Sequence, residues 1–418
     1  MCLASYSLSL LLERNELLEV PLAKNKIHIA IPAIAEKDYL PACIASFQKQ
    51  SFQNFKIYIC INQAKEWWER EDKKDICINN KESLAYLKNL HDDKIIYYDL
   101  SSPEKAFAEK KSHVGTMRRF LMDKINEVAD DDDIIISFDA DSVCPENYLE
   151  EIVKTFNNSK AVALSIPYYH PLTENDSLNR HILRYEIYMR AYAINMWRIK
   201  SQYAFSALGS AIALPVKSYR AINGITPKKS GEDFYFLQKL VKYGKLSHWT
   251  DTCVFPAARY SDRVFFGTGP ALIKGKNNDW LSYPIYKKAC FEEIAKTYAA
   301  FSGLFKKDIP TPMDNFLNKQ FAGKKIWSDL RNNFVKEKDF VRACHEKIDG
   351  LRILQFLKSK YEEKAELHQK NETHLVELLH EYGEEIDIDF EKSDTAFLQK
   401  TRNTLQDIEN DYRKKDII

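Results

Sequence analysis

The chain has 418 residues, of which 45% are hydrophobic and 12% aromatic, and its formal net charge is +1. It is too long for one typical compact core, so we expect one large domain with an extension or a second domain. The near-neutral charge argues against a broad nucleic-acid-binding surface, and eight cysteines without a C-x-x-C pair argue against a zinc site or a disulfide framework and fit a reducing cytoplasm.

The first 25 residues are expected to form a short amphipathic helix. The run SLSLLL has no basic residue before it and continues directly into ERNELLE, which is unlike a signal peptide. No apolar run reaches the ~20 residues that cross a bilayer, so we expect no transmembrane segment. Peripheral contact with a membrane stays open.

Apolar runs separated by helical patterns follow from residue 26 to about residue 275. They predict an α/β fold with a mainly parallel sheet flanked by helices. The predicted strands are Lys26–Pro32, Phe55–Ile61, Lys94–Tyr98, Ile134–Phe138, Ala161–Pro167 and Ala207–Pro215. The predicted helices include Leu40–Gln50, Ser112–Ala129, a segment that starts at Pro145, Arg180–Lys200 and Phe234–Tyr243.

From about Asn277 the alternation typical of strands disappears and charged helical patterns continue to the end. We therefore expect a domain at 26–275 and an α-helical region at 276–418. The helical region carries no motif, and it could cover an acceptor, self-associate or dock a partner. The helix predicted at 180–200 is rich in Tyr and Arg, which suit carbohydrate recognition, although packing is the commoner role at helical spacing.

Two aspartates end the predicted strand at 134–138. Ligands in open α/β sheets sit at the carboxyl ends of strands, and residues two apart on an extended chain point the same way. Asp139 and Asp141 can therefore face one site, where they would hold a hard divalent cation that neutralises a diphosphate leaving group. The alternative is that they only cap the next helix or solvate a turn.

A second acidic pair, Glu232 and Asp233, follows Gly231 at the start of a predicted helix. The positive end of the helix dipole favours carboxylates there. Asp233 is the candidate base for an acceptor hydroxyl, and Glu232 would hold the acceptor or a neighbouring side chain. The alternative is an ordinary acidic cluster on a surface helix.

In this order, the motifs resemble those of inverting glycosyltransferases of the family 2 type, which have the GT-A fold. The resemblance covers roughly residues 26–270. FDADS and GEDFYF match the metal and base motifs strongly, and GSAIA is similar to the segment that shapes the acceptor side. PAIAE matches the first-strand motif at Pro32 and Glu36, and VGTMRR places Arg118 near the nucleotide.

The chain departs from the family at two places. Asn62 stands where the second strand usually ends in an aspartate that reads the base. Many members carry a histidine after the base motif that completes the metal shell, and the corresponding segment here, FPAARYSDRVFFGTG, has none. His248 lies earlier than this segment, on a predicted strand, and is the less favoured ligand. Arg259 and Arg263 occupy this region, where guanidinium groups can clamp a diphosphate in a bidentate way.

The resemblance implies a cytoplasmic enzyme that uses Mn2+ or Mg2+ and transfers a sugar from a UDP- or GDP-linked donor. The acceptor would be a carbohydrate or a lipid-linked molecule in glycan or polysaccharide synthesis, and nucleic acid is not an expected partner. Two alternatives are a nucleotidyltransferase of nucleotide-sugar synthesis and an inactive scaffold with the same fold. The first normally has a glycine-rich loop after the first strand, and PAIAEKDYLP is not such a loop.

Overall fold

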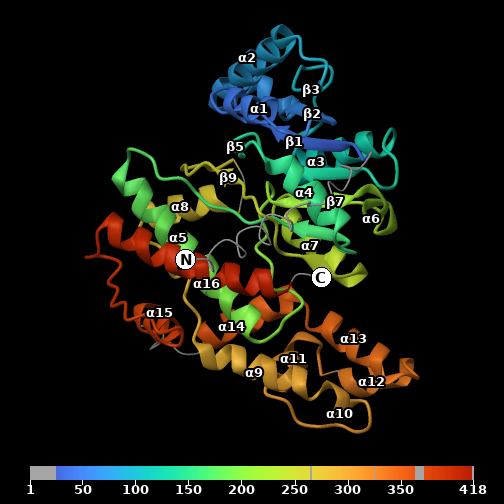
Figure 1. Ribbon diagram of the computed structural model, residues 1–418, viewed down its shortest axis with the longest axis vertical. Helices are drawn as coiled ribbons and strands as arrows, with labels where there is room; N and C mark the ends of the chain where they lie inside the picture. The colour runs from blue at the N-terminus through green and yellow to red at the C-terminus, as the bar shows by residue number, and fades with distance from the viewer. Residues whose placement is uncertain (1–24, 264–265, 324, 363–370, 417–418) are drawn as a thin grey trace, which may run out of the picture.

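The computed structural model describes residues 25–263, 266–323, 325–362 and 371–416. The helix predicted for residues 1–25 lies, except for its last residue, outside this part of the chain. A seven-stranded sheet forms the centre of the N-terminal half, in the order β3-β2-β1-β4-β7-β6-β8 (Figure 1). Its strands are β1 Ile27–Ala33, β2 Phe55–Asn62, β3 Ile95–Leu100, β4 Ile134–Ser137, β6 Ala163–Ser165, β7 Ile212–Pro215 and β8 Leu246–Ser247.

The predicted α/β fold is confirmed, because the sheet is mostly parallel and helices flank it. The pairs β1–β2, β1–β4, β2–β3 and β6–β8 are parallel, whereas β7 runs antiparallel to both β4 and β6. A separate two-stranded ribbon pairs β5 (Ser142–Val143) with β9 (Phe255–Pro256). All six predicted strands exist, and those predicted at 161–167 and 207–215 are shorter than expected.

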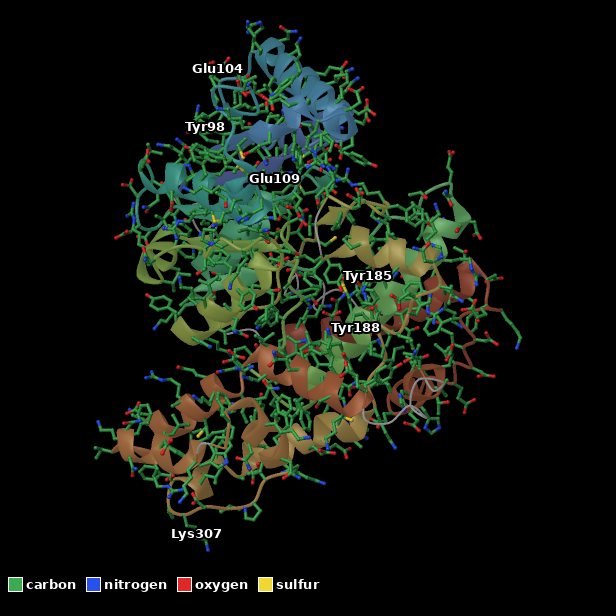
Figure 2. All side chains as sticks on the ribbon, turned by 180° about the vertical axis from the view of Figure 1, so that it is seen from behind. Tyr98, Glu104, Glu109, Tyr185, Tyr188 and Lys307 are labelled. Carbon is green, nitrogen blue, oxygen red and sulfur yellow. The ribbon has the colours of Figure 1, made fainter. Side chains whose placement is uncertain are left out.

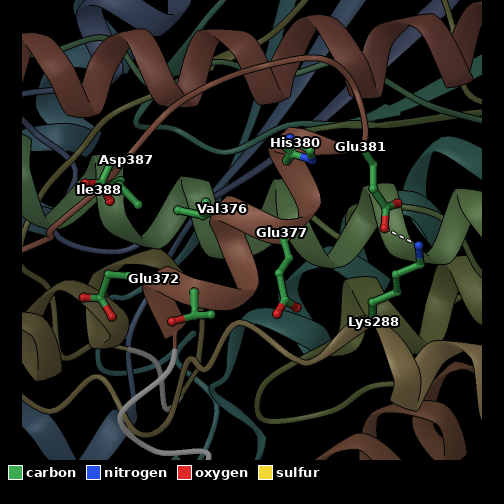
Figure 3. Close-up of a pocket in the computed structure, with 9 residues that line it drawn as sticks. Lys288, Glu372, Val376, Glu377, His380, Glu381, Asp387 and Ile388 are labelled. Atoms are coloured by element: carbon green, nitrogen blue, oxygen red, sulfur yellow. Dashed lines mark hydrogen bonds and ion pairs between the residues drawn. The ribbon is translucent and has the colours of Figure 1, made fainter.

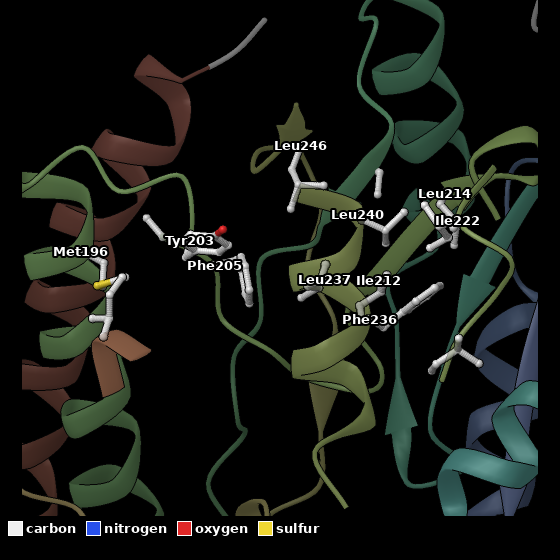
Figure 4. Packing of buried hydrophobic residues seen from close by; sticks show 14 of the residues in the cluster. Met196, Tyr203, Phe205, Ile212, Leu214, Ile222, Phe236, Leu237, Leu240 and Leu246 are labelled. Atoms are coloured by element: carbon white, nitrogen blue, oxygen red, sulfur yellow. The ribbon is translucent and has the colours of Figure 1, made fainter. Parts of the chain in front are cut away.

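Helices cover both faces of the sheet, because successive apolar side chains of β4 point to opposite faces and both faces are buried. Ile135 belongs to a core cluster with α3 and α7, while Ile134 and Ile136 belong to one with α1 and α4. On the first face, residues 236, 237 and 240 of α7 lie close to β7 (Figure 4). The helices around the sheet are α1 Leu40–Gln48, α2 Lys74–Leu90, α3 Val114–Asn126, α4 Tyr148–Asn157, α5 Asp176–Arg198, α6 Val216–Ala221 and α7 Glu232–Tyr243, with short 3-10 turns at Lys65–Glu69, Glu71–Lys73 and Glu109–Lys111.

After β9 every described element is helical, and the helical region predicted from residue 276 is confirmed. These helices are α8 Thr268–Lys276, α9 Lys288–Ala299, α10 Phe301–Leu304, α11 Asp314–Gln320, α12 Ile326–Asn333, α13 Glu337–Lys347, α14 Gly350–Glu362, α15 Asn371–His380 and α16 Thr395–Lys415. Helix α16 returns to pack along α5 (Figure 1). Among the described helices, none is long and apolar enough to cross a membrane.

A buried ion network joins α5 to α16. Arg190 of α5 binds Glu186 on its own helix and Glu409 of α16, with Nη1 2.8 Å from Glu409 Oε2. Arg402 of α16 reaches back to Glu186 at 3.1 Å, and Arg413 binds Glu409 at 2.7 Å. All five side chains are at most 2% exposed. The C-terminal helix is therefore fixed to the sheet domain by charges that have no access to water.

Candidate active site

Arg118 lies at the centre of the site and joins the two acidic motifs. It projects from α3, its side chain is 2% exposed, and its Nη2 donates to Asp139 Oδ1 at 2.9 Å. On the other side its Nε donates to Glu232 Oε1 at 3.2 Å. Burial opposes the charge of Arg118, but Asp139 and Glu232 outweigh it and raise its pKa above the ordinary value. One guanidinium thus holds together carboxylates that are 93 residues apart in sequence.

The elements that carry these groups are fitted closely to Arg118. Its Nη1 donates to Ser137 Oγ and to the carbonyl of Gly209, the latter at 3.1 Å. A Cβ on Gly209 would come within 2.4 Å of Arg118 Nη2 and 3.0 Å of Asp139 Oδ2, so only glycine fits without displacement. Gly231 precedes the helix that carries Glu232, and its φ of +70° favours glycine.

A second cluster at the same sheet edge is built around Glu36. The residue is 6% exposed and both its carboxylate oxygens accept from Arg259, at 2.6 and 2.9 Å. Arg263 Nη1 donates to Glu36 Oε1 at 2.6 Å, and Arg259 also binds Asp141 Oδ2 at 2.5 Å. Burial and the nearby Asp141 raise the pKa of Glu36, against the opposing effect of its arginines. The ring of Tyr39 lies 4.4 Å from the Arg259 guanidinium carbon.

Asp233 differs from the other four carboxylates of the site, each of which is paired with an arginine. Its Oδ1 accepts only from the N–H of Phe234, at 2.7 Å, and it pairs with no cation among the described residues. Burial, and next the charge of Glu232, raise the pKa of Asp233 to about 7, although Arg118 opposes this shift. The group can therefore both accept and release a proton near neutral pH.

Asn62 and Pro32 lie at the edge where Asp139 leaves the sheet. Pro32 pairs with Cys60 two positions from the end of β2, and β1 pairs Ala30 with Ser137, two residues before Asp139. Asn62 is 3% exposed and its backbone carbonyl accepts from Asn80 at 3.0 Å. Among the described residues no hydrogen bond involves its side-chain amide, so both amide atoms are free to meet a ligand.

An aromatic cluster lies beside the carboxylates. Tyr185 and Tyr188 project from α5, in the middle of the molecule (Figure 2). The ring of Tyr185 is 6.1 Å from that of Tyr188 and 5.2 Å from that of Tyr283. Burial raises the pKa of Tyr185 well above its ordinary value, and Asp233 is among the groups that add to the shift. The cluster is therefore close enough to Asp233 to sense its charge.

The predicted site residues thus form two linked clusters. Arg118 gathers Asp139 and Glu232, and Arg259 gathers Glu36 and Asp141. His248 lies elsewhere, 5% exposed, with its ring centroid 4.8 Å from that of Trp197.

Two contributions to the site were not predicted from the sequence. They are Tyr39 under Arg259 and Ser137 beside Arg118. Of these only Ser137 has a local signal, as the one hydroxyl in the buried run IIIS.

The two aspartates can supply part of a shell for a divalent cation. Asp139 uses only Oδ1 and Asp141 only Oδ2 in hydrogen bonds, which leaves one oxygen of each without a donor among the described residues. Their side chains are 34% and 21% exposed, so an ion can reach them. Within the described ranges no group of three or more His, Cys, Asp or Glu side chains could hold a metal ion, and further oxygens must come from a ligand or water.

No protein-family model matches the chain, and no curated protein is similar to it. Glycosyltransferases are among the solved structures to which the chain is similar. S. aureus TarS 1–349 with UDP-GlcNAc is similar over 93% of this chain and 92% of its own, at 10% identity and a TM-score of 0.40. The mannosyltransferase PcManGT of Pyrobaculum calidifontis, with GDP-Man and Mn2+, covers 78% and 87%, at 11% identity and a TM-score of 0.39.

A third structure, GalNAc-T7 with UDP, GalNAc and Mn2+, covers 74% of this chain and 54% of its own, at 12% identity and a TM-score of 0.36. All three contain a nucleotide or a nucleotide sugar, and two contain Mn2+. At such low similarity the function of this chain has to be argued from its own residues.

Proposed function

We propose that the protein is a metal-dependent, inverting glycosyltransferase with the GT-A fold, acting on a nucleotide-diphosphate sugar. The observation that carries the proposal is the bridge from Asp139 through Arg118 to Glu232, beside Asp233. It brings a carboxylate suited to a cation and a carboxylate suited to take a proton into one site. Residues 26–275 would form the transferase unit and 276–418 its helical extension.

The donor would lie across the carboxyl ends of β1, β2 and β4. We assign the base to Pro32 and to the free amide of Asn62, which offers both a donor and an acceptor. We assign the diphosphate to Arg118, Arg259 and Arg263. The last two are now paired with Glu36, so they would exchange part of these contacts for phosphate oxygens.

The charge of the site favours a divalent cation. The cluster contains three arginines and five carboxylates, so its formal charge is −2 with all five ionised, which would repel a diphosphate. The acids and bases counted are Glu36, Asp139, Asp141, Glu232, Asp233, Arg118, Arg259 and Arg263. A cation held by Asp139 and Asp141, either Mn2+ or Mg2+, would supply the Lewis acidity that stabilises the leaving diphosphate.

Each residue near the acceptor would have its own role in the transfer reaction. The acceptor hydroxyl donates its proton to Asp233 as its oxygen attacks the anomeric carbon. The bond from that carbon to the diphosphate oxygen breaks, and its electron pair leaves with the diphosphate. Attack from the side opposite the leaving group inverts the configuration. Glu232, held by Arg118, would orient the acceptor, and the Tyr185 cluster offers aromatic faces to a sugar ring.

Thermal unfolding against UDP, GDP, ADP and CDP, each with and without MnCl2, tests the proposal. A ligand that binds only the folded state at 100 times its Kd stabilises it by about 2.7 kcal/mol, which raises the melting temperature by several degrees. We expect one nucleotide to stabilise the protein, more strongly with Mn2+. The double variant Asp139→Asn/Asp141→Asn should lose the effect of Mn2+.

A matched control is Asp131→Asn/Asp132→Asn, which removes two exposed carboxylates just before β4 and should behave as the wild type. If none of the nucleotides stabilises the protein, the proposal is wrong. A nucleotidyltransferase, the less favoured alternative, would be stabilised by a nucleoside triphosphate in preference to any diphosphate.

A further inference from the structure

A second cavity lies away from the proposed transfer site, where the ends of three helices meet the edge of the sheet. Its volume is about 600 Å3, within the range of small-molecule sites. The lining comes from the C-terminal ends of α5, α7 and α16 and from the edge strand β8. The residues are Trp197, Lys200, Ser201, Gln202, Val241, Gly244, Lys245, Leu246, His248, Tyr412, Lys415 and Asp416.

The cavity is positively charged. Lys200 follows α5, Lys245 precedes β8 and Lys415 ends α16, and all three line the cavity. Asp416 is the only acid among the described residues that line it. Lys245 lies 3.6 Å from Asp416, and neither of the other two lysines has a carboxylate within ion-pair distance in the described part of the chain. The formal charge of the lining is therefore +2.

His248 and Trp197 form the inner wall. His248 is 5% exposed, and burial, followed by Arg413 and Lys245, lowers its pKa to about 3, so the ring is neutral at physiological pH. Its Nε2 lies 4.0 Å from Asp416 Oδ2, beyond hydrogen-bond distance, and can serve a ligand. The rings of Trp197 and Tyr412 provide apolar surface beside the charges.

The topology separates this cavity from the proposed transfer site. Strand β8 runs in the same direction as β4, because two antiparallel pairs and one parallel pair lie between them. Lys245 precedes β8, whereas Asp139 follows β4, so the two residues lie at opposite ends of their strands. They are also three strand positions apart, or about 15 Å across the sheet.

The cavity is nevertheless connected to the transfer site through α7. This helix of 12 residues begins at Glu232 and ends at Tyr243, beside the cavity. Its length is about 18 Å at 1.5 Å per residue. A ligand in the cavity would therefore contact one end of the helix that carries the proposed base at the other.

Another cavity, lined mainly by residues of α15 and of comparable size at about 570 Å3, has the opposite charge. Its lining includes Glu372, Glu377, Glu381 and Asp387, and Lys288 is held by Glu381 (Figure 3). It therefore repels the anions that the cavity at β8 attracts.

We propose that the cavity at β8 binds a small phosphorylated molecule. The lysines supply charge for the phosphate group, and Lys binds phosphate as a compact point charge. The volume exceeds what a phosphate ion fills, and Trp197 and Tyr412 give a surface for the remainder of the ligand. This site is separate from the donor diphosphate and does not depend on the proposed transfer activity.

Isothermal titration of the full chain with glucose 6-phosphate and with inorganic phosphate, at constant ionic strength, tests the proposal. We expect glucose 6-phosphate to bind, and Lys200→Ala/Lys415→Ala to weaken it at least ten-fold. Both side chains are exposed, so the variant should melt as the wild type does. The matched control is Lys306→Ala/Lys307→Ala, two exposed lysines that do not line the cavity.

Further variants test where in the protein the ligand binds. Trp197→Leu should weaken glucose 6-phosphate more than inorganic phosphate, and Lys245→Glu should abolish binding of both. Absence of binding to the wild type overturns the proposal, as does equal loss in the control, which would show unspecific charge attraction. Loss of binding in Asp139→Asn with full binding in Lys245→Glu would place the ligand in the transfer site and also overturn it.

Discussion

The proposed base makes a specific prediction about pH. With the pKa of Asp233 at about 7, about one tenth of the carboxyl groups are ionised at pH 6 and about nine tenths at pH 8. A base acts only in its ionised form, so kcat/KM should rise about ten-fold from pH 6 to pH 8 and then level off. An ordinary aspartate would give a flat profile over this range.

Replacing Asp233 by Asn removes the base and keeps the size of the side chain. We expect transfer to fall by about 10²–10⁴-fold, the usual contribution of general base catalysis, and the remaining rate to lose its rise with pH. Nucleotide binding should be retained, because the contacts assigned to the donor come from other residues. The assay is nucleoside diphosphate release at pH 6–8, with the exposed Asp262→Asn as the control.

Stability gives a second, independent measurement on the same pair of proteins. A carboxyl group whose pKa is raised by folding favours the protonated folded state. Its contribution is fully present below the unfolded pKa of about 3.9 and is lost as the pH rises through about 7. Urea unfolding should therefore show the wild type losing stability relative to Asp233→Asn between pH 5 and pH 8. A flat rate profile together with a constant stability difference would refute the assignment of Asp233.

Three further changes test the packing of the site and of the C-terminal helix. Arg118→Met leaves Glu232 without its cation and should cost about 3–5 kcal/mol in urea unfolding, whereas the exposed Arg70→Met should cost less than about 1 kcal/mol; equal losses would contradict the buried bridge. Gly209→Ala should displace Arg118 and weaken nucleotide binding measured by calorimetry, and unchanged affinity would show that the loop yields freely. Glu409→Gln should lower the free energy of unfolding by about 3–5 kcal/mol, and a loss below 1 kcal/mol would mean that the network is hydrated.

The sequence predicted the strands of the sheet well, since a buried strand is a local pattern. Ile134–Ser137 and Phe55–Asn62 agree with the predicted runs to within one residue. The strand predicted at 207–215 begins only at Ile212, because the residues before it form the loop in which the carbonyl of Gly209 accepts from Arg118. The antiparallel direction of β7 depends on its partners β4 and β6, and no pattern within the strand encodes it.

For the site, the sequence predicted which residue types gather at the sheet edge but not how they pair. Motif order placed Asp139 and Glu232, and the structure adds that Arg118 lies between them. The pair of Glu36 and Arg259 spans 223 residues, and sequence spacing carries no information on such a contact. Their roles in binding and catalysis remain predictions until a ligand is bound.

The buried ion network of α5 and α16 also attaches the C-terminal helix to the edge of the sheet. Its arginines donate to backbone carbonyls as well as to glutamates: Arg190 to Tyr168, Arg402 to His170, and Arg413 to Ser165 and His248. These carbonyls lie on and after β6 and after β8; β8 is the edge strand of the sheet and β6 is its neighbour.

Removing α16 would take away Arg402 and Arg413, so that the carbonyls of His170, Ser165 and His248 lose their donors, whereas Tyr168 would keep Arg190 of α5. A buried group that loses its partner costs about 1–3 kcal/mol, and several are lost at once. The sheet domain therefore depends on a helix that the sequence places more than 100 residues beyond the last strand. The boundary near residue 275 stays a prediction from the sequence pattern, and we expect that residues 26–275 without α16 would not keep this sheet edge intact.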